Sequence, residues 1–177
     1  MSSFSERLIG AARLDAGIFE EVEADVRGTG QAMAVVVFSS VAAGVGAIRL
    51  SSLGPRPLIV GTLAALAGWI AWAMLTYLIG TQVLPEPQTR SNLGELLRTT
   101  GFASAPGILR LLGVAPGLGG VIYIVTSIWM LAAMVVGVRQ ALDYTTTGRA
   151  VAVCAAGWVL SLTIAVVVGI MFGPTVQ

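Results

Sequence analysis

Residues 58–84 have the sequence LIVGTLAALAGWIAWAMLTYLIGTQVL, which contains no charged side chain. An α-helix rises about 1.5 Å per residue, so about 20 apolar residues cross a hydrocarbon core that is roughly 30 Å thick. This stretch can therefore span a bilayer as one helix with some tilt. Further apolar stretches of similar character lie on both sides of it, and together they predict an all-α polytopic membrane protein with about five transmembrane helices.

The composition agrees with a membrane protein. Hydrophobic residues make up 56% of the chain and charged residues only 11%, whereas soluble domains contain about 25% charged residues. A net charge of +1 gives no support for nucleic-acid binding. The chain has no histidine, which excludes histidine-bound haem, pigment or metal and a histidine general base. Cys154 is the single cysteine, so we expect no intrachain disulfide, no metal site and no cofactor.

Residues 1–28 read as a cytoplasmic amphipathic helical segment, and their many acidic side chains argue against a cleavable signal peptide. Ser3 and Glu6 have the spacing of a capping box, and Asp15 can cap a second helix. This helix should pack on the protein's own cytoplasmic face or on a partner, because its net negative charge would be repelled by anionic lipid. Its apolar face comprises Ile18, Phe19, Val22 and Val26, and its acidic face comprises Glu20, Glu21, Glu23 and Asp25.

Residues 29–177 are predicted to form the transmembrane bundle. Ser91 is a candidate start for an amphipathic helix that leads into the third span, with Arg98 on its polar side. Pro106 and Arg110 interrupt that span, so it is either a short, bent crossing or a re-entrant element. The expected spans are 31–49, 58–84, 99–114 (short or broken), 119–139 and 150–172.

Arginine distribution favours five crossings, because short cytoplasmic loops collect positive charge. With five spans, seven arginines lie on the side of the N-terminus and two, Arg49 and Arg56, on the other side. A re-entrant third segment gives six against four. We therefore expect a cytoplasmic N-terminus and a C-terminus outside the cell.

Three short motifs resemble those of the Yip family, the polytopic membrane proteins named after Ypt-interacting proteins, in what looks like its bacterial branch. Arg13-Leu14-Asp15 is followed by Phe19-Glu20-Glu21, and Gly101-Phe102 with Pro106 is similar to the family's Gly-Tyr-x-x-x-Pro element. The third stretch is Val138–Leu142 followed by Thr147–Ala150.

The resemblance implies five spans and a cytoplasmic N-terminus. We expect the protein to lie in the cell (inner or plasma) membrane. Eukaryotic members are associated with Rab-type GTPases, but their Asp-Leu-Tyr-Gly-Pro signature is absent from this sequence. GTPase binding is therefore not expected, and the family label implies an organising or accessory role in the bilayer.

Arg110 is the sharpest anomaly, because no acidic residue lies in any predicted span. Its guanidinium could bind an anionic ligand or lipid phosphate, freed backbone carbonyls or a neighbouring subunit's carboxylate, or it could reach the interface. The pairs Gly113–Gly117 and Gly169–Gly173 have the spacing of close helix contacts. Tyr144 fits an aromatic belt at the membrane surface.

Catalysis is not expected, because the serine and threonine hydroxyls in the spans lack a neighbouring base. We predict a non-catalytic membrane organiser or accessory subunit that binds other membrane proteins or itself; an assembly factor is not separable from this class. The alternative is a small transporter or channel that uses the broken third span and Arg110. Possible partner or lipid contacts are Glu20, Glu21, Glu23 and Arg110.

Overall fold

The computed structural model describes residues 2–47, 55–115 and 117–172. All regular secondary structure among these residues is helical. In chain order the elements are α1 (Phe4–Ala12), α2 (Ala16–Ala24), the 3₁₀ turn η1 (Val26–Gly28), α3 (Thr29–Ala47), α4 (Pro55–Leu78), the π-helical turn η3 (Ile79–Val83), α5 (Leu93–Phe102), the 3₁₀ segment η4 (Ala105–Val114), α6 (Gly119–Ala141) and α7 (Thr147–Phe172). Four helices among these residues are long and apolar enough to cross a membrane. The all-α polytopic prediction is confirmed.

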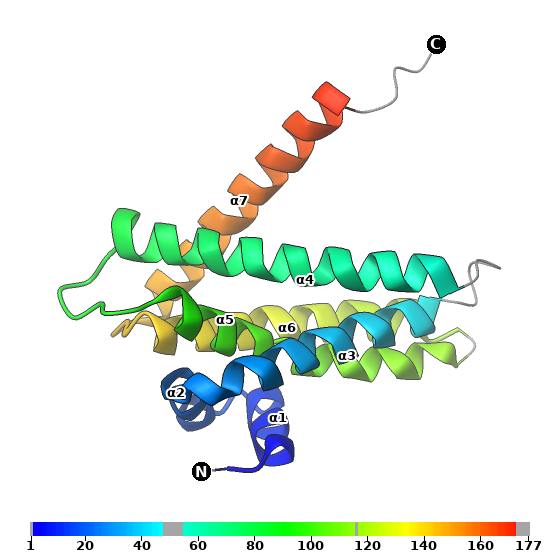
Figure 1. The fold of residues 1–177 in the computed structure, drawn as a ribbon, viewed down its shortest axis with the longest axis horizontal. Coiled ribbons are helices and arrows are strands. Elements are labelled where there is room, and N and C mark those ends of the chain that lie inside the picture. Colours follow the sequence, from blue (N-terminus) through cyan, green and yellow to red (C-terminus); the bar gives the residue numbers. More distant parts are fainter. Residues whose placement is uncertain (1, 48–54, 116, 173–177) are drawn as a thin grey trace.

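Helices α3, α4 and α6 run side by side in one bundle (Figure 1). The third segment, α5 followed by η4, lies between α3 and α6 and follows α3 along its length. Gly101 in α5 lies against Ala32, and the backbone of Arg110 in η4 lies against Gly46. The segment that the sequence left open between crossing and re-entry therefore extends along most of α3 in the same direction.

Pro106 explains the change from α-helix to 3₁₀ helix within the third segment. A proline lacks the amide hydrogen, and its ring clashes with the carbonyl four residues earlier, here Phe102. Helix α5 ends at Phe102, and Pro106 lies in the first turn of η4. The predicted break is thus present at the predicted place.

The N-terminal helices fold against the flank of the bundle, in the half where α3 begins (Figure 1). The Ser3–Glu6 capping box and the Asp15 cap are both present. Phe19 and Val22 are completely buried. The indole of Trp129 in α6 donates to the carbonyl oxygen of Ala12 over 2.6 Å. Of the two alternatives expected for this segment, the protein's own surface or a partner, the structure shows packing on the protein's own bundle.

Two predictions about side-chain exposure, one for Val26 and one for Arg98, were wrong. Val26 is 75% exposed, because α2 ends at Ala24 and the Asp25 side chain caps the next 3₁₀ turn. Arg98 is 4% exposed rather than on a polar face. Its Nε donates to the carbonyl oxygens of Val22 and Glu23, so a buried cation caps the end of α2.

Two further expectations are corrected in the loops. Asn92, not Ser91, caps α5, and it forms a capping box with Glu95. Gly117 has φ +81° and lies in the turn before α6, so Gly113 and Gly117 do not share a helix face. The second glycine pair ends at Gly173, which lies outside the described residues.

Tyr144 lies in the protein interior rather than in an aromatic belt. Only 4% of it is exposed. Its hydroxyl lies 2.7 Å from the carbonyl oxygen of Leu84 and 3.1 Å from that of Gly80. The π-helical turn at the end of α4 leaves these carbonyls to be satisfied, and the loop between α6 and α7 supplies the donor.

Candidate functional site

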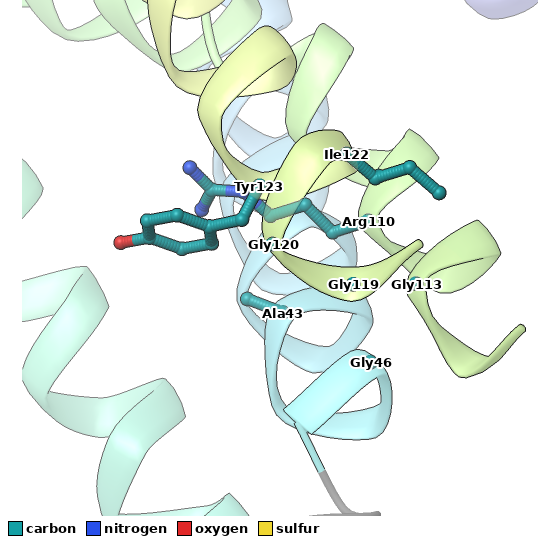
Figure 2. A pocket seen from close by; sticks show the side chains of 8 residues that line it. All are labelled: Ala43, Gly46, Arg110, Gly113, Gly119, Gly120, Ile122 and Tyr123. Atoms are coloured by element: carbon teal, nitrogen blue, oxygen red, sulfur yellow. The ribbon is translucent and has the colours of Figure 1, made fainter. Parts of the chain in front are cut away.

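Arg110 projects from η4 past α6, with its guanidinium beside the ring of Tyr123 (Figure 2). The guanidinium carbon lies 4.5 Å from the ring centroid, which is a cation–π contact. Nε donates to Thr126 Oγ1 over 3.2 Å, and Nη2 donates to Ser127 Oγ over 2.8 Å. The charge is therefore held by two hydroxyls and an aromatic face.

Both hydroxyls are oriented by their own helix. Thr126 Oγ1 donates to the carbonyl oxygen of Ile122, and Ser127 Oγ donates to that of Tyr123. A hydroxyl has one hydrogen and two lone pairs, so each can still accept from Arg110. Nothing in the sequence indicates that these hydroxyls also accept hydrogen bonds from the arginine.

Arg110 can approach α3 closely because glycines line its path. A Cβ on Gly46 would come within 2.5 Å of the Arg110 carbonyl oxygen. Gly107, one turn earlier in η4, lies against Ser39 and Met130, and a Cβ there would also collide. These glycines set the close spacing of α3, η4 and α6 around the guanidinium.

A second polar site lies on the other half of the molecule, where α2 meets the loop between α6 and α7. We call Glu20, Glu23 and Asp143 the acidic surface. These three carboxylates line a hollow of about 450 Å³ together with Arg139 and Gln140. Glu20 accepts a hydrogen bond from Gln140 over 2.8 Å, while Arg139 donates to the carbonyl oxygens of Tyr144 and Thr145.

Within the acidic surface, the carboxyl group of Glu23 has a strongly raised pKa. Burial, and then the nearby carboxylates of Glu95 and Asp143, raise its pKa to about 7, although Arg98 acts in the opposite direction. A carboxyl group with this pKa is half protonated near neutral pH. Neutralising cations from outside would stabilise its ionised form.

Glu21, the third predicted acidic contact, is used inside the protein. Its carboxylate accepts from Ser2 and pairs with Arg7, and these bonds lower its pKa to about 2. The structure therefore brings Glu20 and Glu23 together with Asp143, whereas Glu21 lies toward α1. The sequence analysis did not propose Asp143 as a contact. Asp143 is close to α2 only through the fold.

The family-like motif lies at the crossing of α3 and α5. Gly101 allows contact with Ala32, Phe102 is completely buried, and Pro106 starts η4. All three residues shape the third segment. Among the described residues, no group of three or more Cys, Asp or Glu side chains could hold a metal ion.

The fold is that of a multi-pass, all-α membrane protein with a broken third segment and helices folded back at the N-terminal end. The family model described as the Yip1 domain matches residues 16–169. This chain belongs to the Yip family. No curated protein and no solved structure matches it.

Proposed function

We propose that this Yip-family protein is a non-catalytic membrane organiser or accessory subunit that binds a basic segment of a partner membrane protein at the acidic surface. The observation that carries the proposal is the hollow of about 450 Å³ that is lined by Glu20, Glu23 and Asp143. The guanidinium in this hollow, that of Arg139, is already bound to backbone carbonyls. The surface therefore offers carboxylates that can accept Lys or Arg side chains.

The electrostatics of Glu23 support a cationic partner. Its pKa of about 7 reflects burial and neighbouring negative charge. A cation that enters the hollow favours the ionised carboxylate and releases the proton. Partner affinity should therefore increase as the pH rises from 6 to 8.

The polar groups in the long helices favour a structural role over transport. Helices α3, α4, α6 and α7 contain no Asp or Glu, and a proton or cation pathway usually requires acidic residues at membrane depth. Thr62, Thr76 and Thr163 donate to carbonyls of their own helices. The transporter alternative rests on Arg110 and the broken third segment alone.

We further propose that the third segment crosses the membrane, with the N-terminus in the cytoplasm, the C-terminus outside and the protein in the cell membrane. The arginine count supports this orientation, because five crossings leave only Arg49 and Arg56 on the far side. The acidic surface then lies on the cytoplasmic side of the bilayer.

The test is affinity purification from membranes in a mild detergent with a tag placed after Gln177, because Ser2 is bonded to Glu21. We expect a defined set of membrane proteins in stoichiometric amount from the wild type. A Glu20→Gln, Glu23→Gln double variant should lose it, whereas Glu6→Gln should retain it. Glu6 is the matched control, because it is an exposed acid on α1 and glutamine preserves a capping box. Recovery of the chain alone, or equal recovery with both variants, would refute the proposal.

A further inference from the structure

Three hollows in the bundle share one lining residue, Arg110. One of about 340 Å³ lies between α3 and the start of α6 and is also lined by Tyr123. A second of about 350 Å³ lies between α4, α6 and α7. A third of about 340 Å³ lies between α3 and α4. The Arg110 side chain thus contributes to the walls of all three hollows, and Figure 2 shows it in the first of them.

The second hollow combines hydrogen-bond donors with apolar walls. Arg110 uses Nε and Nη2 for the α6 hydroxyls, and its Nη1 has no partner among the described residues. Trp72 lines the same hollow, and its Nε1 is buried without a hydrogen-bond partner in the described part of the chain. The remaining walls are largely apolar and include Met130, Leu131, Met134 and Trp158.

This combination selects an anionic amphiphile. Unused donors on Arg110 and Trp72 call for an acceptor, and the described lining of the hollow contains no carboxylate to neutralise the arginine. A guanidinium binds phosphate through parallel hydrogen bonds. Basic pockets between membrane helices are a known form of lipid head-group site.

We propose that Arg110 binds the phosphate group of one anionic phospholipid, whose acyl chains lie in the apolar hollow between α4, α6 and α7. Trp72 Nε1 supplies a second donor to the head group. The site is separate from the acidic surface, so the lipid proposal does not depend on the proposed binding of a partner protein.

The depth of the proposed phosphate position distinguishes this lipid from the bulk lipids around the protein. Thr126 and Ser127 are seven and eight residues past the start of α6, so the phosphate lies about 10 Å inside the level at which that helix begins. Helix α7 contacts α4 through Trp158 and Trp72, whose ring centroids are 6.0 Å apart, and beyond that contact it leaves the bundle (Figure 1).

The experiment is native mass spectrometry of the full chain in a non-ionic detergent, titrated with phosphatidylglycerol or phosphatidylcholine. We expect one phosphatidylglycerol to bind about tenfold more tightly than phosphatidylcholine. Both lipids carry a phosphate, but the choline cation of phosphatidylcholine repels the Arg110 guanidinium, whereas phosphatidylglycerol has a net negative charge. Arg110→Gln should abolish the preference. Arg56→Gln should retain it, because that exposed arginine lies at the start of α4, outside the hollow.

A second variant, Trp72→Phe, tests the proposal without changing Arg110. Trp72→Phe keeps the apolar wall and removes one donor, so it should reduce the preference several-fold while Arg110 stays in place. If Arg110→Gln does not fold, an unchanged preference in Trp72→Phe overturns the proposal. Equal affinities of the wild type for the two lipids, or equal effects of Arg110→Gln and Arg56→Gln, also overturn it. Displacement by millimolar inorganic phosphate would assign the site to free phosphate instead of lipid.

Discussion

Arg7 in α1 and Glu21 in α2 form an ion pair, with Arg7 Nη2 2.8 Å from Glu21 Oε1. The arginine side chain is 2% exposed, and its Nη1 also lies 2.8 Å from Asp25 Oδ2 and 3.0 Å from Gln31 Oε1. One guanidinium therefore joins α1, α2 and the first span. The acidic surface depends on this junction, because it fixes how α2 lies on the bundle.

Replacing Arg7 should loosen the N-terminal helices. Arg7→Leu leaves the partly buried carboxylates of Glu21 and Asp25 without a countercharge, and we expect a cost of about 2 kcal/mol in local stability. Trypsin cleavage after Arg13, which is exposed at the end of α1, should accelerate by about tenfold or more. Arg27→Leu, which removes an exposed arginine, is the control and should leave the rate unchanged. Equal rates in the wild type and Arg7→Leu would show that the pair does not hold α1 in place.

Glu23 should make the stability of the protein decrease as the pH rises. The native state raises the pKa of Glu23 from 4.5 to about 7 and therefore binds more protons than the unfolded state between these values. The free energy of unfolding then falls with pH across that window and is constant above it. Glu23→Gln should match the wild type near pH 4.5 and be more stable by about 1–2 kcal/mol at pH 8, after allowance for solvent screening.

Thermal unfolding of the two proteins in detergent at several pH values measures this difference. Glu6→Gln serves again as the control for loss of one exposed acid. A constant difference between Glu23→Gln and the wild type from pH 5 to pH 8 would contradict the assignment of the titration to Glu23.

The features that the sequence predicted correctly are local. Ser3 and Asp15 cap helices by bonding backbone amides only two or three residues away. Pro106 ends α5 through its own ring. Such signals lie within one turn of the chain, so they can be recognised without knowledge of the fold.

The features that the sequence did not predict are side chains bound to distant backbone atoms. Arg98 caps α2 through carbonyls some 75 residues away, and Tyr144 reaches Leu84 across 60 residues. Every residue has a carbonyl, so no residue type marks the acceptor in advance. Arg110 is unusual in the sequence, but its hydroxyl partners are not predictable, because the partners expected for an arginine at this depth are a carboxylate, a free carbonyl or a lipid phosphate.

Gly101 should tolerate no side chain. A Cβ at this position would lie 2.7 Å from Ala32 Cβ and 3.1 Å from the Ala32 carbonyl oxygen, atoms that move only if α3 and α5 separate. Gly101→Ala should therefore destabilise the protein by about 2–3 kcal/mol. The matched control is Gly61→Ala in α4, where no atom lies within 4 Å of an added Cβ. Thermal unfolding in detergent should show a clear loss for Gly101→Ala only, and similar melting of both variants would contradict the close approach.

The Tyr144 hydroxyl should contribute measurably to stability. Tyr144→Phe leaves the carbonyls of Gly80 and Leu84 without this donor and should cost about 1–2 kcal/mol. Tyr123→Phe is the control, because Tyr123 is 57% exposed and its ring contact with Arg110 is preserved. Comparison of the two unfolding midpoints decides the question, and a larger loss for Tyr123→Phe would contradict the buried role of Tyr144.

The third segment should place its two ends on opposite sides of the membrane. Gln88 precedes α5, Leu118 precedes α6 and Thr146 precedes α7, and all three are exposed. In a Cys154→Ala background, a membrane-impermeant maleimide added to intact cells should label Leu118→Cys. It should label Gln88→Cys and Thr146→Cys only after permeabilisation, because the arginine bias keeps those loops in the cytoplasm. If Leu118→Cys and Gln88→Cys react from the same side, the third segment is re-entrant, and Arg110 then enters the bundle from the side that carries the acidic surface.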